Sequence, residues 1–177
     1  GNTTIRSAAE YAVNHGALVV AAAGNCGCED LTAENPFILS VSATDENDGV
    51  ASFSSTGPFV DLSAPGSNIL TTERFGLYGS VSGTSLSSPI VAGVAGLMVA
   101  ANPSLTPALV TQLLEETAAG SGNYDPSFGY GRVDAFAAVR AAVGYAPPVD
   151  TTVPTLAMTA PIPGDSVSGL VVVDVTA

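Results

Sequence analysis

The chain has 177 residues, enough for one domain with a substantial core and a piece of a second. Its composition, 46% hydrophobic and 11% charged, is that of a compact globular protein and excludes a disordered chain. Asp and Glu total 16 against 4 for Lys and Arg, so the formal charge is −12. Such a surface repels nucleic acid and anionic membranes, and we expect neither as a partner.

Apolar runs in the chain are too short to predict a membrane span. The closest candidate, residues 90–101, is interrupted by glycine and falls below the ~20 residues that cross a bilayer. We therefore expect a buried helix there. The chain opens inside a helix-like pattern, so we expect its natural start, and any signal peptide with it, to be missing.

The first half of the chain predicts a helix followed by buried strands. Residues 17–25 and 37–43 are continuous apolar runs, typical of strands buried on both faces of a parallel sheet. A polar loop over 43–57 precedes short strands around the Pro65-Gly66 turn. Residues 3–16 predict an amphipathic helix that ends at Gly16, with an apolar face of Ile5, Ala8, Ala9, Ala12 and Val13.

Three helices are predicted in the second half. Residues 85–101 predict a buried helix with Pro89 in its first turn, where no backbone hydrogen bond is lost. Thr106 is the predicted N-cap of the next helix, with Pro107 at its first position. The last helix lies within 129–144. The predicted apolar faces of these two helices are Leu109, Val110, Leu113 and Leu114, and then Val133, Phe136, Ala137 and Val139.

This order of elements indicates an α/β fold, a mainly parallel sheet flanked by helices, over residues 1–144. The composition then changes. Residues 145–155 predict a Pro/Thr linker, and 156–177 alternate like the first strands of an Ig-like β-sandwich. The last segment is too short for a whole domain, so we expect a truncated all-β appendage. A modular end of this kind suggests a secreted protein that uses the appendage to attach to a surface or a substrate.

Two cysteines, Cys26 and Cys28, stand in the stretch "GNCGCED". A zinc site needs more ligands than these two and His15, the only histidine, provide. Because a C-x-C spacing is short for an unstrained mutual disulfide, we expect free thiols or bridges to residues outside the chain.

Ser85 follows Gly83-Thr84 at the start of the predicted buried helix, which suits a nucleophile. A serine hydroxyl attacks only when a base removes its proton and the oxyanion is stabilised. The helix start turns unpaired N–H groups and its dipole toward a developing negative charge. Asn25, just beyond a strand's carboxyl end, offers a side-chain amide at the edge where α/β sheets bind ligands. The structural alternative is that Ser85 is a helix N-cap and Asn25 a turn residue.

Four motifs in order resemble the C-terminal half of the subtilisin-like serine protease domain. They are "VVAAAGN" (19–25), "ASFSSTG" (51–57), "LSAPG" (62–66) and "SGTSLSSPIVAGVAGL" (82–97), and the resemblance extends to about Gly144. It implies a serine endopeptidase that hydrolyses peptide bonds through an acyl-enzyme on Ser85. The implied partners are protein or peptide substrates and a propeptide. No cofactor is expected to be required, apart from structural calcium in the full-length enzyme.

The same resemblance implies roles for residues beside the nucleophile. Asn25 and the Ser85 N–H form the implied oxyanion hole, with Thr84 supporting it from behind. The implied substrate-binding residues are Ala22, Ala23 and Gly24 in the primary specificity pocket, Val81 and Ser82 on the leaving-group side, and Gly83, which allows close approach.

The family's catalytic Asp and His are absent from this chain. They belong to Asp-Ser/Thr-Gly and His-Gly-Thr-His motifs, and residues 1–177 contain neither. His15 is no substitute, since it ends the first predicted helix, where a histidine is electrostatically stabilised. We expect a piece that lacks the preceding half of the domain and is inactive alone. The alternative is a non-catalytic pseudoprotease or binding scaffold, and the coding sequence upstream of Gly1 distinguishes the two.

Other sites and enzyme classes have weaker support. Asp61 and carbonyl groups near residues 33–38 could hold calcium, although a solvated or capping Asp61 fits the few visible ligands better. The acidic run over 43–49 is predicted to be a solvated loop, because its spacing is not that of an EF-hand. An α/β-hydrolase is excluded by Gly-Thr-Ser-Leu-Ser in place of Gly-x-Ser-x-Gly, and a P-loop by the absence of lysine.

Overall fold

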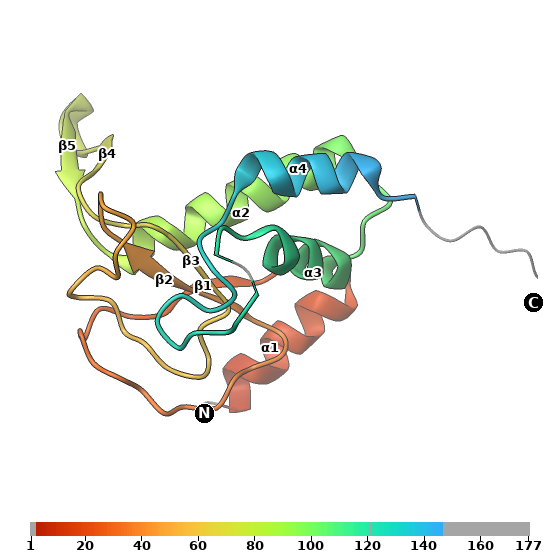
Figure 1. Ribbon diagram of the computed structural model, residues 1–177, viewed down its shortest axis with the longest axis horizontal. Helices are drawn as coiled ribbons and strands as arrows, with labels where there is room; N and C mark the ends of the chain where they lie inside the picture. Colours follow the sequence, from red (N-terminus) through yellow and green to blue (C-terminus); the bar gives the residue numbers. More distant parts are fainter. Residues whose placement is uncertain (1–2, 121, 147–177) are drawn as a thin grey trace, which may run out of the picture. The chain divides into compact units, whose positions relative to one another are not determined.

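The computed structural model describes residues 3–120 and 122–146, and nearly all of these belong to a compact unit over Gly1–Tyr145. Its centre is a parallel sheet in the order β1 (Val20–Ala22), β2 (Leu39–Thr44) and β3 (Leu62–Pro65), shown in Figure 1. The predicted α/β class is confirmed. The predicted β-sandwich segment, and the linker from residue 147 onward, lie outside the described residues.

The helices are α1 (Thr3–Asn14), α2 (Thr84–Ala101), α3 (Pro107–Thr117) and α4 (Ala135–Gly144). The last three close the core on the parallel sheet, whereas α1 adds no residue to the core cluster. The long helix α2 packs on all three parallel strands and against α3 and α4. Alternate strand residues point to one face, and on the α2 side they are apolar. The core therefore joins Leu39, Val41, Leu62 and Ala64 of the sheet to Val91, Met98, Val110, Leu114, Ala138 and Ala142 of the helices.

Helix α2 has the length and composition of a membrane-crossing helix, with a mean hydropathy of 1.6 over 18 residues. It is longer than the apolar run 90–101 that the sequence suggested. Its contacts with the sheet and with two helices are those of the central core helix of this unit. They bury one face of α2, since 33% of its residues are buried, so the prediction of a helix buried on nearly all sides is confirmed for that face only.

An antiparallel ribbon projects from the rest of the unit in Figure 1. It consists of β4 (Ile69–Thr72) and β5 (Tyr78–Val81), joined through a short 3₁₀ turn, Arg74–Gly76. The sequence predicted β4 but not β5, which has only four residues. The ribbon leads the chain directly into Ser82 and Gly83, and so to the start of α2.

The first helix and first strand form where predicted but are less buried than predicted. On α1 only Ala9 is buried, and Ile5 is 55% exposed. Strand β1 has three residues, and none of them is fully buried. In the described part of the chain β1 is an edge strand, with a neighbouring strand on one side only, which explains its partial exposure.

Pro89 is one position where the sequence prediction was wrong. Helix α2 begins at Thr84, so Pro89 stands in its second turn and not its first. A proline there lacks the N–H that would otherwise bond to the carbonyl four residues earlier, which belongs to Ser85. The Ser85 carbonyl is thus left without its helical donor.

Two further expectations need correction. Cys26 and Cys28 form a mutual disulfide, with Cα atoms 5.2 Å apart, within the usual range for a disulfide. The intervening Gly27 has φ +59, a left-handed conformation that bends the chain enough to bring the two side chains together. On α4, Phe136 was predicted to face the core but is 72% exposed, and the buried residues of this helix are Ala138 and Ala142.

The predicted start of α3 is confirmed. The Thr106 hydroxyl accepts a hydrogen bond from the Leu109 N–H at 3.3 Å, and Pro107 is the first residue of α3. Asp134 caps α4 in the same way, through the Ala137 N–H at 2.9 Å. Each cap satisfies a backbone donor that has no partner inside its helix.

The core contact of α3 gives a stability prediction. Leu114 is fully buried between α3 and the rest of the core, so Leu114→Ala removes apolar contacts and leaves a cavity. We expect a loss of about 2–5 kcal/mol in the free energy of unfolding, measured by urea denaturation. Phe136→Ala, at an exposed position of α4, is the matched control and should cost well under half as much. Equal losses would contradict the core described above.

Candidate active site

Ser85 lies at the amino end of α2 with its side chain exposed. Gly83 is the N-cap and provides no side-chain cap, and its carbonyl accepts from the Leu86 N–H at 2.9 Å. The Ser85 N–H and hydroxyl have no partner within residues 3–120 and 122–146. Both groups therefore stand open at a helix start, where the backbone dipole favours negative charge.

Asn25 is held against the start of α2 by Thr84. The Thr84 N–H donates to Asn25 Oδ1 at 2.9 Å, and the Thr84 hydroxyl donates to the same oxygen at 3.0 Å. The Thr84 hydroxyl in turn accepts from the Gly24 N–H at 3.2 Å. Since both donors occupy the amide oxygen, the Asn25 Nδ2 group is the end left to donate. Thr84 is fully buried whereas Asn25 is exposed, so Thr84 holds the amide oxygen from inside the fold and the Nδ2 end stays open to solvent.

Two glycines, Gly66 and Gly83, allow the end of β3 and the start of α2 to lie close together. The Gly83 N–H donates to the Gly66 carbonyl at 2.8 Å, which ties the start of α2 to the end of β3. A Cβ on Gly66 would collide with the side chains of Ser87 and Ala43. At Gly83 an added Cβ would lie 3.6 Å from Asn25 Nδ2, so Asn25 borders the turn just before Ser85.

The predicted substrate-binding residues surround this point. Ala22 ends β1, and the Ala23 N–H donates to the Val41 carbonyl at 2.9 Å. Gly24 has φ +109, a conformation that favours glycine, and its carbonyl accepts from the Ser55 N–H at 2.9 Å. On the other side of Ser85, Val81 ends β5, and the Ser82 hydroxyl accepts from the Asn68 N–H at 2.9 Å. The structure thus brings these residues together at the start of α2.

His15 lies at the other end of α2. Gly16 lines a cavity together with Val99 and Pro103, at the carboxyl end of that helix. At 1.5 Å per residue, Val99 lies roughly 20 Å along the axis from Ser85. The His15 ring stacks on Tyr11 and donates from Nδ1 to the Tyr11 carbonyl at 2.7 Å. It therefore has no part in the chemistry at Ser85.

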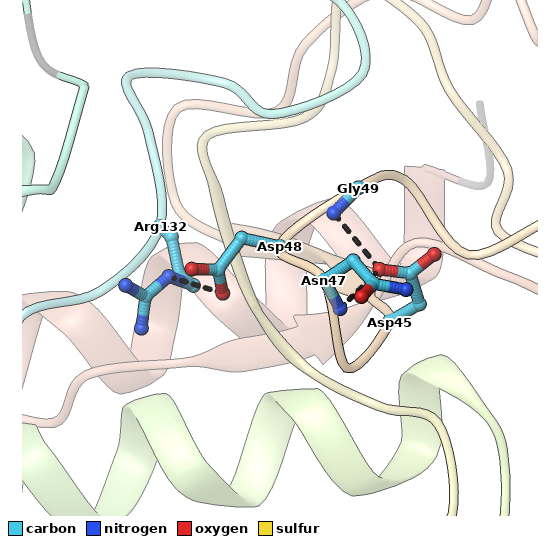
Figure 2. A network of polar contacts seen from close by, with 5 residues as sticks. All are labelled: Asp45, Asn47, Asp48, Gly49 and Arg132. Atoms are coloured by element: carbon cyan, nitrogen blue, oxygen red, sulfur yellow. Dashed lines mark hydrogen bonds and ion pairs between the residues drawn. The ribbon is translucent and has the colours of Figure 1, made fainter.

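The acidic loop after β2 is organised by its own backbone. Figure 2 shows the Asp45 carboxylate accepting hydrogen bonds from the N–H groups of Asn47 and Gly49, both at 2.9 Å. Asp48 forms an ion pair with Arg132 at 3.0 Å. The pair is solvent-exposed and adds little stability. Among the described residues, no three His, Cys, Asp or Glu side chains are grouped to hold a metal ion.

Asp61 lies in an acidic cavity rather than on the surface. Its carboxylate accepts from the Ser40 N–H at 2.6 Å, and the cavity beside it, of about 230 Å³, is also lined by Glu34 and Glu115. Burial, opposed by the Ser40 hydrogen bond and reinforced by Glu34 and Glu115, raises the pKa of Asp61 to about 7. Burial together with the charges of Glu34 and Glu116 also raises the pKa of Glu115 to about 7.

Sequence reasoning missed the residues that hold the site from outside it. The Ser55 hydroxyl accepts from the Cys26 N–H at 3.3 Å, and the Ser55 backbone supports Gly24. Gly66 belongs to a quoted motif, but its contact with α2 depends on how β3 and α2 pack. Only the glycine in "APG" signalled a close approach at that point.

Comparison with known proteins places the fold in the subtilisin-like class. The protease domain of PatA, in its self-cleaved form, matches with a TM-score of 0.70 and 31% identity, over 79% of this chain and 55% of that one. The subtilase family matches residues 1–131, more than half of the chain. The chain therefore belongs to the subtilase family.

Relatives are also found among characterised proteases. The halolysin-like extracellular serine protease Nep of Natrialba magadii is 44% identical over 126 residues, which are 70% of this chain and 23% of that protein. Thermitase of Thermoactinomyces vulgaris is 41% identical over 145 residues, 79% of this chain and 50% of thermitase. The chain thus spans half or less of the length of these two relatives.

The acidic cavity predicts that stability falls as the pH rises. Asp61 and Glu115 have folded-state pKa values of about 7, above their ordinary values of 3.8 and 4.5. The folded state therefore holds these protons more tightly than the unfolded state. The stabilisation is complete below about pH 4 and is lost as the pH rises through about 7.

Asp61→Asn tests this dependence, because an amide oxygen can still accept from the Ser40 N–H but carries no charge. Thermal unfolding should be measured from pH 5 to 9 for this variant and for the unsubstituted chain. We expect the variant to melt higher than its parent above pH 8 and to differ less at pH 5. Parallel melting curves at every pH would contradict the role of the carboxyl group.

Proposed function

We propose that this chain is the nucleophile-bearing part of a serine endopeptidase. The Ser85 Oγ attacks the carbonyl carbon of a peptide bond and forms a tetrahedral intermediate. The oxyanion receives hydrogen bonds from Asn25 Nδ2 and the Ser85 N–H. Collapse of the intermediate breaks the C–N bond, releases the amine and leaves an acyl-enzyme on Ser85, which water then hydrolyses.

One observation carries the proposal: Thr84 occupies both acceptor positions of the Asn25 amide oxygen, at 2.9 and 3.0 Å. An asparagine that served only as a turn residue would not need its amide group to be oriented in this way. An amide fixed before the reaction stabilises charge that develops in the transition state, without reorganisation cost. An open Ser85 hydroxyl at the adjacent helix start supplies the nucleophile.

The proton-transfer partners come from outside residues 1–177 in this proposal. A base takes the Ser85 proton during attack and returns it to the leaving amine. Neither family motif that supplies the Asp and the His occurs in the chain. Loss of both partners lowers the rate on the order of 10⁶-fold, so we propose that residues 1–177 are inactive alone.

The setting of the parent enzyme follows from its relatives and composition. We propose a secreted protease with protein or peptide substrates and a propeptide, because one relative is described as extracellular and the chain is strongly acidic. Structural calcium in the full-length enzyme also remains a proposal. Asp61 uses one carboxylate oxygen on the Ser40 N–H, and no step of the reaction depends on a metal.

Replacing the nucleophile and the oxyanion donor tests the reaction. In the parent protease, which joins this chain to the segment carrying the Asp and the His, Ser85→Ala should abolish acyl-enzyme formation. Asn25→Ala should lower kcat by about 10²–10³-fold with a small change in KM, because the amide bonds mainly to the transition state. A peptide-amidase assay measures both. Turnover by residues 1–177 alone, abolished by Ser85→Ala, would contradict the requirement for outside partners.

Thr84 should act by positioning Asn25. Thr84→Val keeps the size of the side chain but removes the hydroxyl that donates to Asn25 Oδ1 and accepts from Gly24. We expect kcat to fall roughly 10- to 100-fold, whereas Thr84→Ser should retain most of it. Steady-state kinetics measures kcat for both variants. Their melting temperatures show whether a fall in kcat comes from misplacing Asn25 or from a less stable fold. Equal activity of the two variants would exclude the hydroxyl as the orienting group.

A further inference from the structure

A second cavity borders the end of β1, on the side of the chain that leads to Asn25. It has a volume of about 180 Å³ and is lined by apolar groups of Ala23, Ala33, Ile38 and Phe59, together with Asp30 and Thr32. This volume suits one long side chain. None of the residues that line it has been used in the reaction described above, apart from the assignment of Ala23 to the specificity pocket.

The cavity is close to the reacting bond. Ala23 stands two residues before Asn25, so their Cα atoms are at most about 7.6 Å apart. The Asn25 amide is bonded to Thr84, the neighbour of Ser85. The wall formed by Ala23 is therefore within reach of the side chain of a peptide residue whose carbonyl oxygen lies at Asn25.

Asp30 gives this cavity its charge. Its Oδ1 accepts from the Thr32 N–H at 2.8 Å and from the Thr32 hydroxyl at 2.6 Å. These two hydrogen bonds lower the pKa of Asp30, so the carboxylate is ionised at neutral pH. The second oxygen, Oδ2, has no partner within residues 3–120 and 122–146. Asp30 is also the only ionisable side chain among the described residues that line the cavity.

We propose that this cavity is the primary specificity pocket and that Asp30 selects substrates with arginine or lysine at the residue whose carbonyl is attacked. The apolar walls accept the methylene stem of such a side chain, and the carboxylate oxygen receives its charged head. The inference rests on the proposed endopeptidase function and deepens it by naming the substrate class.

The strength of the selection follows from the exposure of Asp30. Its side chain is solvent-accessible at the mouth of the cavity, so dissolved salt screens it. A hydrogen bond to a charged group of this kind corresponds to a preference of about tenfold, well below that of a fully buried ion pair. The preference should therefore weaken at high ionic strength.

The test uses the parent protease and four fluorogenic peptides that differ only at the residue before the scissile bond: arginine, lysine, citrulline and leucine. Citrulline has nearly the shape of arginine but no charge. We expect kcat/KM for arginine and lysine to exceed that for citrulline about tenfold, and Asp30→Asn to remove this advantage. The asparagine retains an acceptor for Thr32, so the loop should keep its shape.

Glu29→Gln is the matched control, because it removes the same charge from the adjacent exposed residue, which does not line the cavity. It should leave the preference intact. Equal rates for arginine and citrulline, or an unchanged preference in Asp30→Asn, would overturn this inference alone. An equal fall in kcat/KM for the leucine and arginine peptides in Asp30→Asn would also overturn it, because Asp30 would then have a structural role. Failure to hydrolyse any of the four peptides would instead overturn the proposed function.

Discussion

The hydrogen bonds between Thr84 and Asn25 are the interaction on which the rest of the site depends. They join the carboxyl end of β1 to the amino end of α2, two segments 59 residues apart in the chain. The Gly83–Gly66 hydrogen bond adds the end of β3 to the same point. Parallel strands present their carboxyl ends at one edge, and α2 packs along all three of them. The core contacts that place α2 on the sheet therefore also set the distance between Ser85 and Asn25.

The sequence signals for this candidate site are local. A glycine before a helix start, a serine inside it and an asparagine after an apolar strand are each visible in a few residues. The cap predicted at Thr106 belongs to the same class, since a capping side chain bonds to its own helix. The family resemblance then assigned roles that spacing alone left open, including the alternative of a simple N-cap.

The predictions that failed depend on neighbours that a local pattern does not specify. Whether Ile5 or Phe136 is buried is decided by what packs against α1 or α4, and their apolar character alone overestimated burial. The disulfide between Cys26 and Cys28 depends on the left-handed turn at Gly27, which sequence spacing did not reveal. Helix α2 starts one residue earlier than its pattern suggested. Even counted from Ser85, Pro89 is the fifth residue of the helix and lies past its first turn of 3.6 residues, so the first-turn placement was wrong for either start.

Two aspartates show how the fold gives one residue type opposite properties. Asp61 is buried beside Glu34 and Glu115 and has one backbone donor, so proton binding is favoured there. Asp30 is exposed and has two donors from Thr32, so the charged form is favoured. The Asp61 carboxyl group can bind a proton near pH 7, which removes the electrostatic cost of burying its charge. The Asp30 carboxyl group keeps its charge beside a cavity that is lined in part by Ala23, and this is the charge that we propose discriminates between substrates. Net charge alone, at −12, could not have separated these two roles, because it counts both aspartates equally.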